Sequence, residues 1–255
     1  MVTLKTPREL VLLREAGRVV AAALAAVREG AEVGVTLAEL DRLAAKVIAK
    51  AGATPAFLGY HPPWAPTPFP AVICASVNDA VVHGIPDGAQ LADGDLVSID
   101  CGAFVRGWCG DAAISFIVGE RDRADAELVA ATDAALARGI SAAQPGGQLG
   151  DVGYAIGLPV RRAGYGLLAD HGGHGVGRAM HEDPFVYNEG RPGQGFRLRP
   201  GLVIALEPML IADGTDDYVI DGDGWTLRTA SGSRAAHSEH TIAVTDDGPM
   251  ILTAL

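Results

Sequence analysis

Cysteine is scarce in this sequence, and its spacing argues against two classes of small fold. The 255-residue chain has three cysteines, Cys74, Cys101 and Cys109, an odd number with no C-x-x-C pair. Disulfide scaffolds need an even set of cysteines, and structural zinc sites need closely paired ones. Both are therefore disfavoured, and a reducing, cytoplasmic location is expected.

Long hydrophobic runs are also missing. The longest one, VVAAALAAV at residues 19–27, lies between Arg18 and Arg28. Roughly 20 apolar residues are needed to cross a bilayer, so this run is too short. The N-terminal residues lack the basic, apolar and small-residue succession of a signal peptide. No membrane association is expected.

Basic residues are in the minority, with 20 Lys and Arg against 31 Asp and Glu, which gives a formal charge of −11. A polyanion would be repelled on average, and the chain has no basic run that could reverse this. Nucleic-acid binding is therefore not expected. The apolar share of 49% is ample for a sizeable globular core.

Capping signals locate the helices. Thr6-Pro7-Arg8-Glu9 and Thr36-Leu37-Ala38-Glu39 are capping boxes, in which a threonine precedes a glutamate by three residues. They predict helices that begin at residues 7 and 37, and Gly52 would end the second. Two further helices are predicted over residues 123–140 and 151–163.

The second and fourth helices resemble each other at an offset of 112 residues. Two strands of the first half also have counterparts in the second half. GDLVSID at 94–100 is matched by GLVIALE at 201–207, and DAAISFIV from Asp111 is matched by EHTIAVTD from Glu239. No Pro/Gly/Ser linker divides the chain near residue 120. The sequence therefore predicts one α+β domain over residues 1–255, built from two pseudo-symmetric halves at about 1–120 and 121–255.

Four acids are expected at the ends of these strands, namely Asp100, Asp111, Glu207 and Glu239. Clustered carboxylates repel one another unless a cation holds them or protons neutralise them. His174, in the glycine-rich stretch HGGHGVGRAMHEDP at 171–184, would be a fifth ligand. Five ligands suit two divalent ions that share bridging carboxylates, and such a set favours Mn, Fe, Co or Zn without choosing among them.

The sequence resembles a known family over nearly its whole length. The matching motifs are VNDAVVHGIP (77–86), VSIDCGAFVRGWCGD (97–111), HGGHGVGRAMHEDP, LVIALEP (202–208), DGWTL (223–227) and SEHTIAV (238–244). They resemble those of type I methionine aminopeptidases. The resemblance implies the pita-bread fold, in which two halves surround a dinuclear metal site.

The resemblance also implies roles for individual residues. Asp111 and Glu239 would bridge two ions, Asp100 would complete one site, and His174 and Glu207 would complete the other. Glu207 would also accept a proton from the attacking water. His181 would hydrogen-bond the scissile carbonyl, and His83 would assist transfer to the leaving amine.

A methionine pocket is implied at positions that match the family's lining residues: Tyr60, His61, Phe69, Cys74 and Trp225. Asn78 matches a position associated with a monovalent cation. The chain departs from the family pattern at Phe57, Met180 and His171, and in a longer Pro-rich loop, HPPWAPTPFP at 61–70. Trp64 and Phe69 of this loop are expected to be exposed or packed over a cavity.

The expected function is removal of the initiator methionine from nascent polypeptides whose second residue is small. The spacing of 33 residues between His174 and Glu207 leaves no room for the helical insertion of type II relatives. A transient contact with the ribosome and a monomeric state are expected. Two alternatives stay open: a proline-specific relative such as prolidase or aminopeptidase P, and a non-catalytic binding module.

Overall fold

A computed structural model describes residues 2–255. Its four helices are α1 (Pro7–Gly30), α2 (Leu37–Lys50), α3 (Arg123–Ala142) and α4 (Leu149–Arg162). The strands are β1 (Thr54–Pro55), β2 (Ile73–Val77), β3 (Ala80–Val82), β4 (Leu96–Val105), β5 (Trp108–Ile117), β6 (Gly166–Leu167), β7 (Gly172–Gly175), β8 (Glu182–Tyr187), β9 (Val203–Leu206), β10 (Met209–Ile211), β11 (Tyr218–Ile220), β12 (Leu227–Thr229), β13 (Ala235–His237), β14 (Glu239–Thr245) and β15 (Gly248–Ile251).

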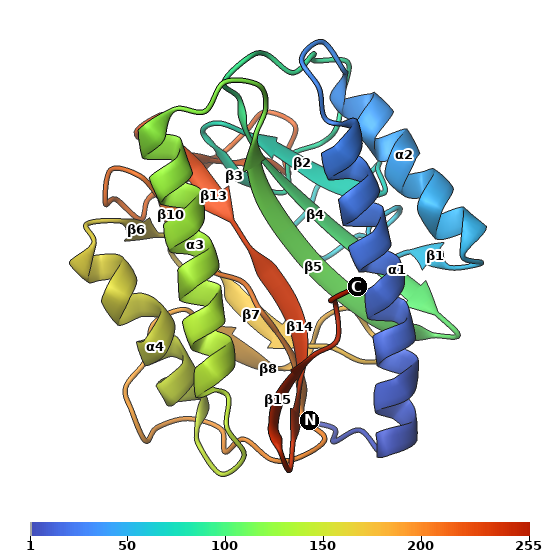
Figure 1. Cartoon of the computed structure of the whole chain (residues 1–255), viewed down its shortest axis with the longest axis vertical. Coiled ribbons are helices and arrows are strands. Elements are labelled where there is room, and N and C mark those ends of the chain that lie inside the picture. Colours follow the sequence, from blue (N-terminus) through green and yellow to red (C-terminus); the bar gives the residue numbers. More distant parts are fainter. Residues whose placement is uncertain (1) are drawn as a thin grey trace.

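Each half of the chain contributes one helix pair and one antiparallel strand pair. Helices α1 and α2 pack together beside β4 and β5, and α3 and α4 pack together on the side of β9 and β14 (Figure 1). The repeat predicted from the sequence therefore corresponds to two similar structural units.

The two halves share one curved sheet. Its strands follow the order β1-β4-β5-β14-β9-β7-β8, with β2 also paired to β4 and β15 to β14. The halves join where β5 pairs with β14, with Glu239 directly opposite Ala113. Their strands therefore form a continuous surface, and side chains from both halves can meet on it.

The helices cover one face of this sheet. In the first half, Ile99, Cys101 and Ala112 are buried in a core with apolar residues of α1 and α2. In the second half, Ile204 and Leu206 are buried in a core with residues of α3 and α4. Because side chains alternate along a strand, the residues next to these positions project from the opposite face.

The helix starts follow the capping signals. The Thr6 and Thr36 side chains accept hydrogen bonds from the backbone N–H groups of Glu9 and Glu39, and both glutamates return a bond to the cap backbone at 2.8 Å. Such a cap contributes about 1 kcal/mol. Helix α4 begins at Leu149 instead of 151. Its cap is Gln148, whose backbone N–H donates a hydrogen bond to the Asp151 carboxylate.

Two of the four acids expected at strand ends lie inside strands. Asp100 and Asp111 belong to the long hairpin of β4 and β5, which turns at Arg106 and Gly107, both with positive φ. In the sequence an apolar run ends at Asp100 and an alternating run begins at Asp111, but the backbone pairing extends past both acids, through residues such as Gly110. A Cβ at Gly110 would collide with the backbone of α1 at Gly17, so the glycine allows the hairpin to pass close to the helix.

Candidate active site

The strand register brings the four acids to one face of the sheet. Asp111 lies directly opposite Gly102, two residues from Asp100, so both carboxylates project from the same side of the β4–β5 hairpin. Glu239 shares that side because its partner, Ala113, is also the partner of Asp100. Glu207 follows Leu206, which pairs with His240, so it also lies on the face turned away from the helices.

Glycines on β7 allow His174 to reach these carboxylates. A Cβ at Gly173 would collide with the Ala205 carbonyl oxygen, and one at Gly175 would collide with that of Asp183. The bare backbone therefore lies close against its neighbours. The His174 Nε2 atom lies 3.6 Å from Glu207 Oε1 and 3.9 Å from Asp111 Oδ2.

The hydrogen bonding of His174 suits a ligand. Its Nδ1 donates to the Gly175 carbonyl oxygen at 2.9 Å, which leaves Nε2 facing the two carboxylates. Burial lowers the pKa of His174 to about 3 and keeps the imidazole neutral. A neutral imidazole with one nitrogen fixed by a backbone carbonyl is the form that binds metals.

The carboxylates repel one another in a region withdrawn from bulk water. Burial raises the pKa of Asp100 to about 7. Burial, and then the charges of neighbouring acids, raise the pKa values of Asp111, Glu207 and Glu239 well above their ordinary range. One buried oxygen each of Asp100, Asp111 and Glu239 has no hydrogen-bond partner. Unpaired buried oxygens of this kind are what a bound cation would satisfy.

The donor set fits divalent ions. Ligand atoms of Asp111, His174 and Glu239 lie within 4.8 Å of one another, and so do those of Glu207, His237 and Glu239. Glu239 belongs to both groups. Carboxylate oxygens and imidazole nitrogens suit first-row divalent metals.

Sequence reasoning missed His237. It is buried on β13, its Nε2 lies 3.9 Å from Glu207 Oε2, and that nitrogen has no hydrogen-bond partner. Its position two residues before Glu239 was the available signal, because residues i and i+2 of an extended chain can face the same side.

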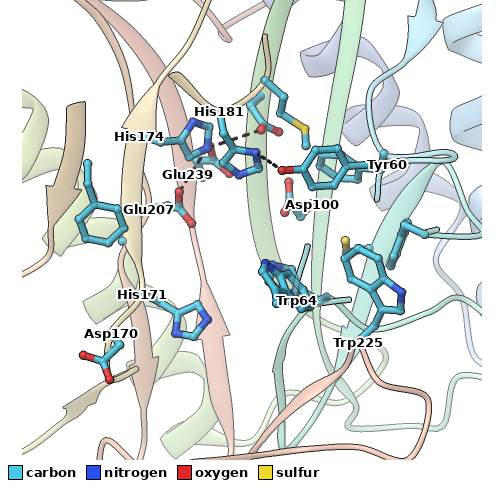
Figure 2. Close-up of a pocket in the computed structure, with 18 residues that line it drawn as sticks. Tyr60, Trp64, Asp100, Asp170, His171, His174, His181, Glu207, Trp225 and Glu239 are labelled. Carbon is cyan, nitrogen blue, oxygen red and sulfur yellow. Dashed lines mark hydrogen bonds and ion pairs between the residues drawn. The ribbon is translucent and has the colours of Figure 1, made fainter. Parts of the chain in front are cut away.

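A cavity of about 310 Å³ opens beside the carboxylates. The carboxylates and His174 gather at one side, and Trp64 and Trp225 lie across from them (Figure 2). Away from the ligand cluster, the buried wall includes the apolar residues Phe57, Phe69, Cys74, Met180 and Trp225. The departures from the family pattern at Phe57 and Met180 therefore fall on the wall of this cavity.

Three further histidines line the cavity. The Tyr60 hydroxyl and His181 Nδ1 are hydrogen-bonded at 3.1 Å, and the two rings stack (Figure 2). His83 has a positive φ of 59° and a buried Nδ1 without a partner. Burial lowers its pKa to about 3, with smaller effects from His171 and His181, so it is neutral at pH 7. His171, a departure from the family pattern, also lines the cavity.

His61, expected at the methionine pocket, lies elsewhere, and Asn78, expected at a monovalent-cation position, lies apart from this cavity. The His61 ring bonds the Ala65 carbonyl oxygen within its own loop and does not line the cavity. Asn78 lines a separate cavity, where its side-chain amide donates to Asp95 and its side-chain oxygen accepts from the Leu96 N–H. Sequence position alone could not show that His61 turns from the pocket, because its side chain bonds a carbonyl oxygen of its own loop.

Comparisons with known proteins agree with this geometry. The model of metallopeptidase family M24 matches residues 11–246. Methionine aminopeptidase 1 of Mycobacterium tuberculosis is 54% identical over 252 residues, which cover 96% of this chain and 92% of that protein. Methionine aminopeptidase of Aquifex aeolicus is 45% identical, over 100% of this chain and 99% of the relative.

Solved structures give the same result. The crystal structure of methionine aminopeptidase from Thermotoga maritima superposes with a TM-score of 0.95 at 42% identity, over 100% of both chains. Prolidase from Pyrococcus furiosus, at 23% identity, has a TM-score of 0.79 over 99% of this chain and 65% of that one, which shows a common fold alone. The expected pita-bread fold is confirmed.

A carboxylate and histidine cluster on a sheet shared by two similar halves defines a metallopeptidase site, and the chain belongs to metallopeptidase family M24. Within that family it groups with the methionine aminopeptidases, which match it over nearly their full length.

Proposed function

We propose that this metallopeptidase removes the initiator methionine from polypeptides whose second residue is small. One observation carries the proposal: buried carboxylates with unpaired oxygens lie beside an apolar cavity large enough for one side chain. The relatives named methionine aminopeptidase support the choice of substrate.

Two divalent ions would be held by the five residues inferred from the sequence, Asp100, Asp111, His174, Glu207 and Glu239. Asp111 and Glu239 would be shared between the ions, and for Glu239 its position in both potential ligand groups supports this. Such ions polarise a carbonyl oxygen and lower the pKa of a nearby water molecule. Mn, Fe, Co and Zn all suit this donor set.

The apolar part of the cavity would take the methionine side chain. Phe57, Phe69 and Trp225 form edge-to-face pairs there, with ring centroids 6.4 Å apart for the first two and 5.0 Å for the last two. Cys74 lies on the same wall, and burial raises its thiol pKa, so it stays neutral and apolar in character. A flexible thioether packs favourably against aromatic rings.

His181 would hydrogen-bond the scissile carbonyl. When the Tyr60 hydroxyl donates to Nδ1, the single proton of the neutral imidazole stands on Nε2. Burial lowers the pKa of His181, which favours this neutral form. A fixed N–H donor next to the reacting carbonyl stabilises the negative charge that develops on its oxygen.

Proton transfer would use Glu207 and His83. The raised pKa of Glu207, caused by burial and then by Asp100, makes its carboxylate a stronger base than an exposed glutamate. His83 lines the same cavity and is neutral, so its imidazole can assist transfer to the leaving amine. Its left-handed backbone conformation fixes the direction in which the ring enters the cavity.

We place the reaction in the cytoplasm, on chains that emerge from the ribosome, with transient ribosome contact and a monomeric enzyme. The two halves would act as one catalytic domain, because the shared sheet carries ligands from both. None of the helices within residues 2–255 is long and apolar enough to cross a bilayer.

The decisive experiment is metal depletion followed by reconstitution. Chelator-treated protein should not act on Met-Ala-Ser, and Mn²⁺ or Co²⁺ should restore methionine release. Met-Leu-Ser should be cut poorly by the same preparation. Release of methionine at the wild-type rate after the ions have been removed would contradict the proposal.

The same assay tests the alternatives. Cleavage of a Gly-Pro dipeptide with Met-Ala-Ser left intact would identify a proline-specific enzyme. Metal binding with neither peptide cut would favour a binding module. The 23%-identical prolidase match supports only a common fold and gives no preference for proline substrates.

A further inference from the structure

The Pro-rich loop 61–70 is fixed against the cavity at several points. The Trp225 indole N–H donates to the Thr67 carbonyl oxygen at 3.0 Å, and Phe69 exchanges backbone hydrogen bonds with Gly59 and Tyr60. Pro66 lies so close to Gly224 that a Cβ there would collide with its ring. Proline and these contacts restrict the backbone, so the loop presents its side chains in set positions.

One side chain of this loop projects over the cavity without being buried. Trp64 is 57% exposed although it lines the cavity wall. Its ring stacks beside His83 with centroids 6.0 Å apart and meets Trp225 edge-on at 5.0 Å (Figure 2). The loop thus places a large aromatic surface next to the residue proposed to act at the leaving amine.

Exposure distinguishes the two ends of the cavity. Phe57, Phe69 and Cys74 are less than 9% exposed and close its inner end. Trp64 and Phe185, 57% and 43% exposed, are the large apolar wall residues open to solvent within the described chain. A substrate whose first side chain fills the inner end must therefore continue out past Trp64 and Phe185.

The order of the side chains from the inner end of the cavity to its mouth identifies the substrate residue that lies next to Trp64. His83 lies between the inner wall and the mouth, in ring contact with both Trp225 and Trp64. If His83 serves the leaving amine, the residue that carries this amine lies next to Trp64. That residue is the second one of the substrate.

We propose that Trp64 is a specificity-determining residue that limits the size of the second substrate residue. This inference rests on the proposed function and adds the side chain that enforces it. The indole contacts the rings of His83 and Trp225, and the buried Phe69 packs against Trp225 in turn. A branched or long second side chain would therefore have to occupy the space of the ring.

The test compares Met-Ala-Ser with Met-Leu-Ser in wild type, Trp64→Ala, Trp64→Phe and Leu58→Ala, all loaded with Mn²⁺. Leu58 is the matched control, because it is a 54% exposed apolar residue close by in the chain that does not line the cavity. The measured quantity is the ratio of kcat/KM for the alanine peptide to kcat/KM for the leucine peptide.

Trp64→Ala is expected to lower this ratio by about tenfold or more through a gain on the leucine peptide, as expected when a few methylene groups gain room. Trp64→Phe should lower it less, and Leu58→Ala should leave it at the wild-type value. Metal content and Tm, measured on each variant, show that the fold and the ligand cluster persist.

Two results would overturn the inference. An unchanged ratio in Trp64→Ala would show that the indole does not meet the second residue. An equal loss on both peptides would show that Trp64 only supports His83. Failure of the proposed function looks different, since wild-type protein would then cut neither methionine peptide.

Discussion

The Lys5 ammonium group lies 2.7 Å from the Glu182 carboxylate, directly beside His181 in the chain. The Lys5 side chain is almost fully buried, and Glu182 also accepts hydrogen bonds from the backbone N–H groups of Arg178 and Ala179. Burial alone would raise the pKa of Glu182, but the bonds from Lys5 and the backbone outweigh it and lower that pKa. The N-terminal segment thereby holds the turn that carries His181.

Lys5→Met should destabilise the protein by about 3 kcal/mol, because it leaves the partly buried Glu182 carboxylate without its cation. Urea unfolding monitored by circular dichroism measures this change. The matched control is Arg123→Met, which breaks the exposed pair with Glu127 and should cost less than about 1 kcal/mol. Equal costs in the two variants would show that the Lys5 pair has no special structural role.

Tyr60→Phe should reduce kcat for Met-Ala-Ser by about tenfold while the metal content stays at the wild-type level. The variant keeps the ring stacked on His181 but removes the hydroxyl that bonds Nδ1. Loss of that bond frees the imidazole to exchange tautomers and weakens the donor aimed at the carbonyl. An unchanged kcat would show that the Tyr60 hydroxyl does not help His181 to stabilise the charge on the carbonyl oxygen.

Asp111→Asn should abolish stable binding of both ions, because the proposal makes this carboxylate a ligand shared between them. Elemental analysis after dialysis should find about two ions per wild-type chain and almost none in the variant. Asp247→Asn, at an exposed turn, is the control and should bind like wild type. His181→Ala should keep both ions and lose turnover. Retention of one tight ion in Asp111→Asn would exclude a bridging role.

The pH dependence of stability in the metal-free protein should reflect two opposing groups of residues. Folding raises the pKa of Asp100 from 3.8 to about 7 and also raises those of Asp111, Glu207 and Glu239, so the folded state binds extra protons. Folding lowers the pKa values of His83, His174 and His237 from 6.5 to about 3, so the unfolded state binds extra protons there. The two effects oppose each other between about pH 4 and 6.5.

Above pH 6.5 the histidines are neutral in both states, and the carboxyls alone still release protons. The stability that their protonated forms contribute is present at low pH and is lost as the pH rises through the folded pKa values. The Tm of metal-free protein should therefore fall from pH 6.5 to 8. With saturating Mn²⁺ the Tm should rise over the same interval, because metal and protons compete for these groups. A Tm of the metal-free protein that increases from pH 6.5 to 8 would contradict the raised pKa values of these four carboxyl groups.

The helices and the duplication could be read from the sequence because they depend on local order. Capping boxes at Thr6 and Thr36 satisfy backbone groups within three residues, so their pattern is sufficient to predict a helix start. Repeated strand patterns, with an acid after an apolar run or at the start of an alternating strand, gave the four carboxylates, although Asp100 and Asp111 lie inside strands. The β4–β5 hairpin continues through glycines because it packs closely against α1. The local sequence pattern does not predict such a contact.

The sequence by itself determined the helix starts, the two-fold plan and the residue types able to hold metal, since each follows from neighbours along the chain. Only the tertiary structure decided that His61 points away from the pocket, that His237 reaches Glu207, and that the Pro-rich loop lays Trp64 over the cavity. The reason is physical: these outcomes depend on contacts between segments far apart in the chain, and sheet register and close packing at glycine set those contacts.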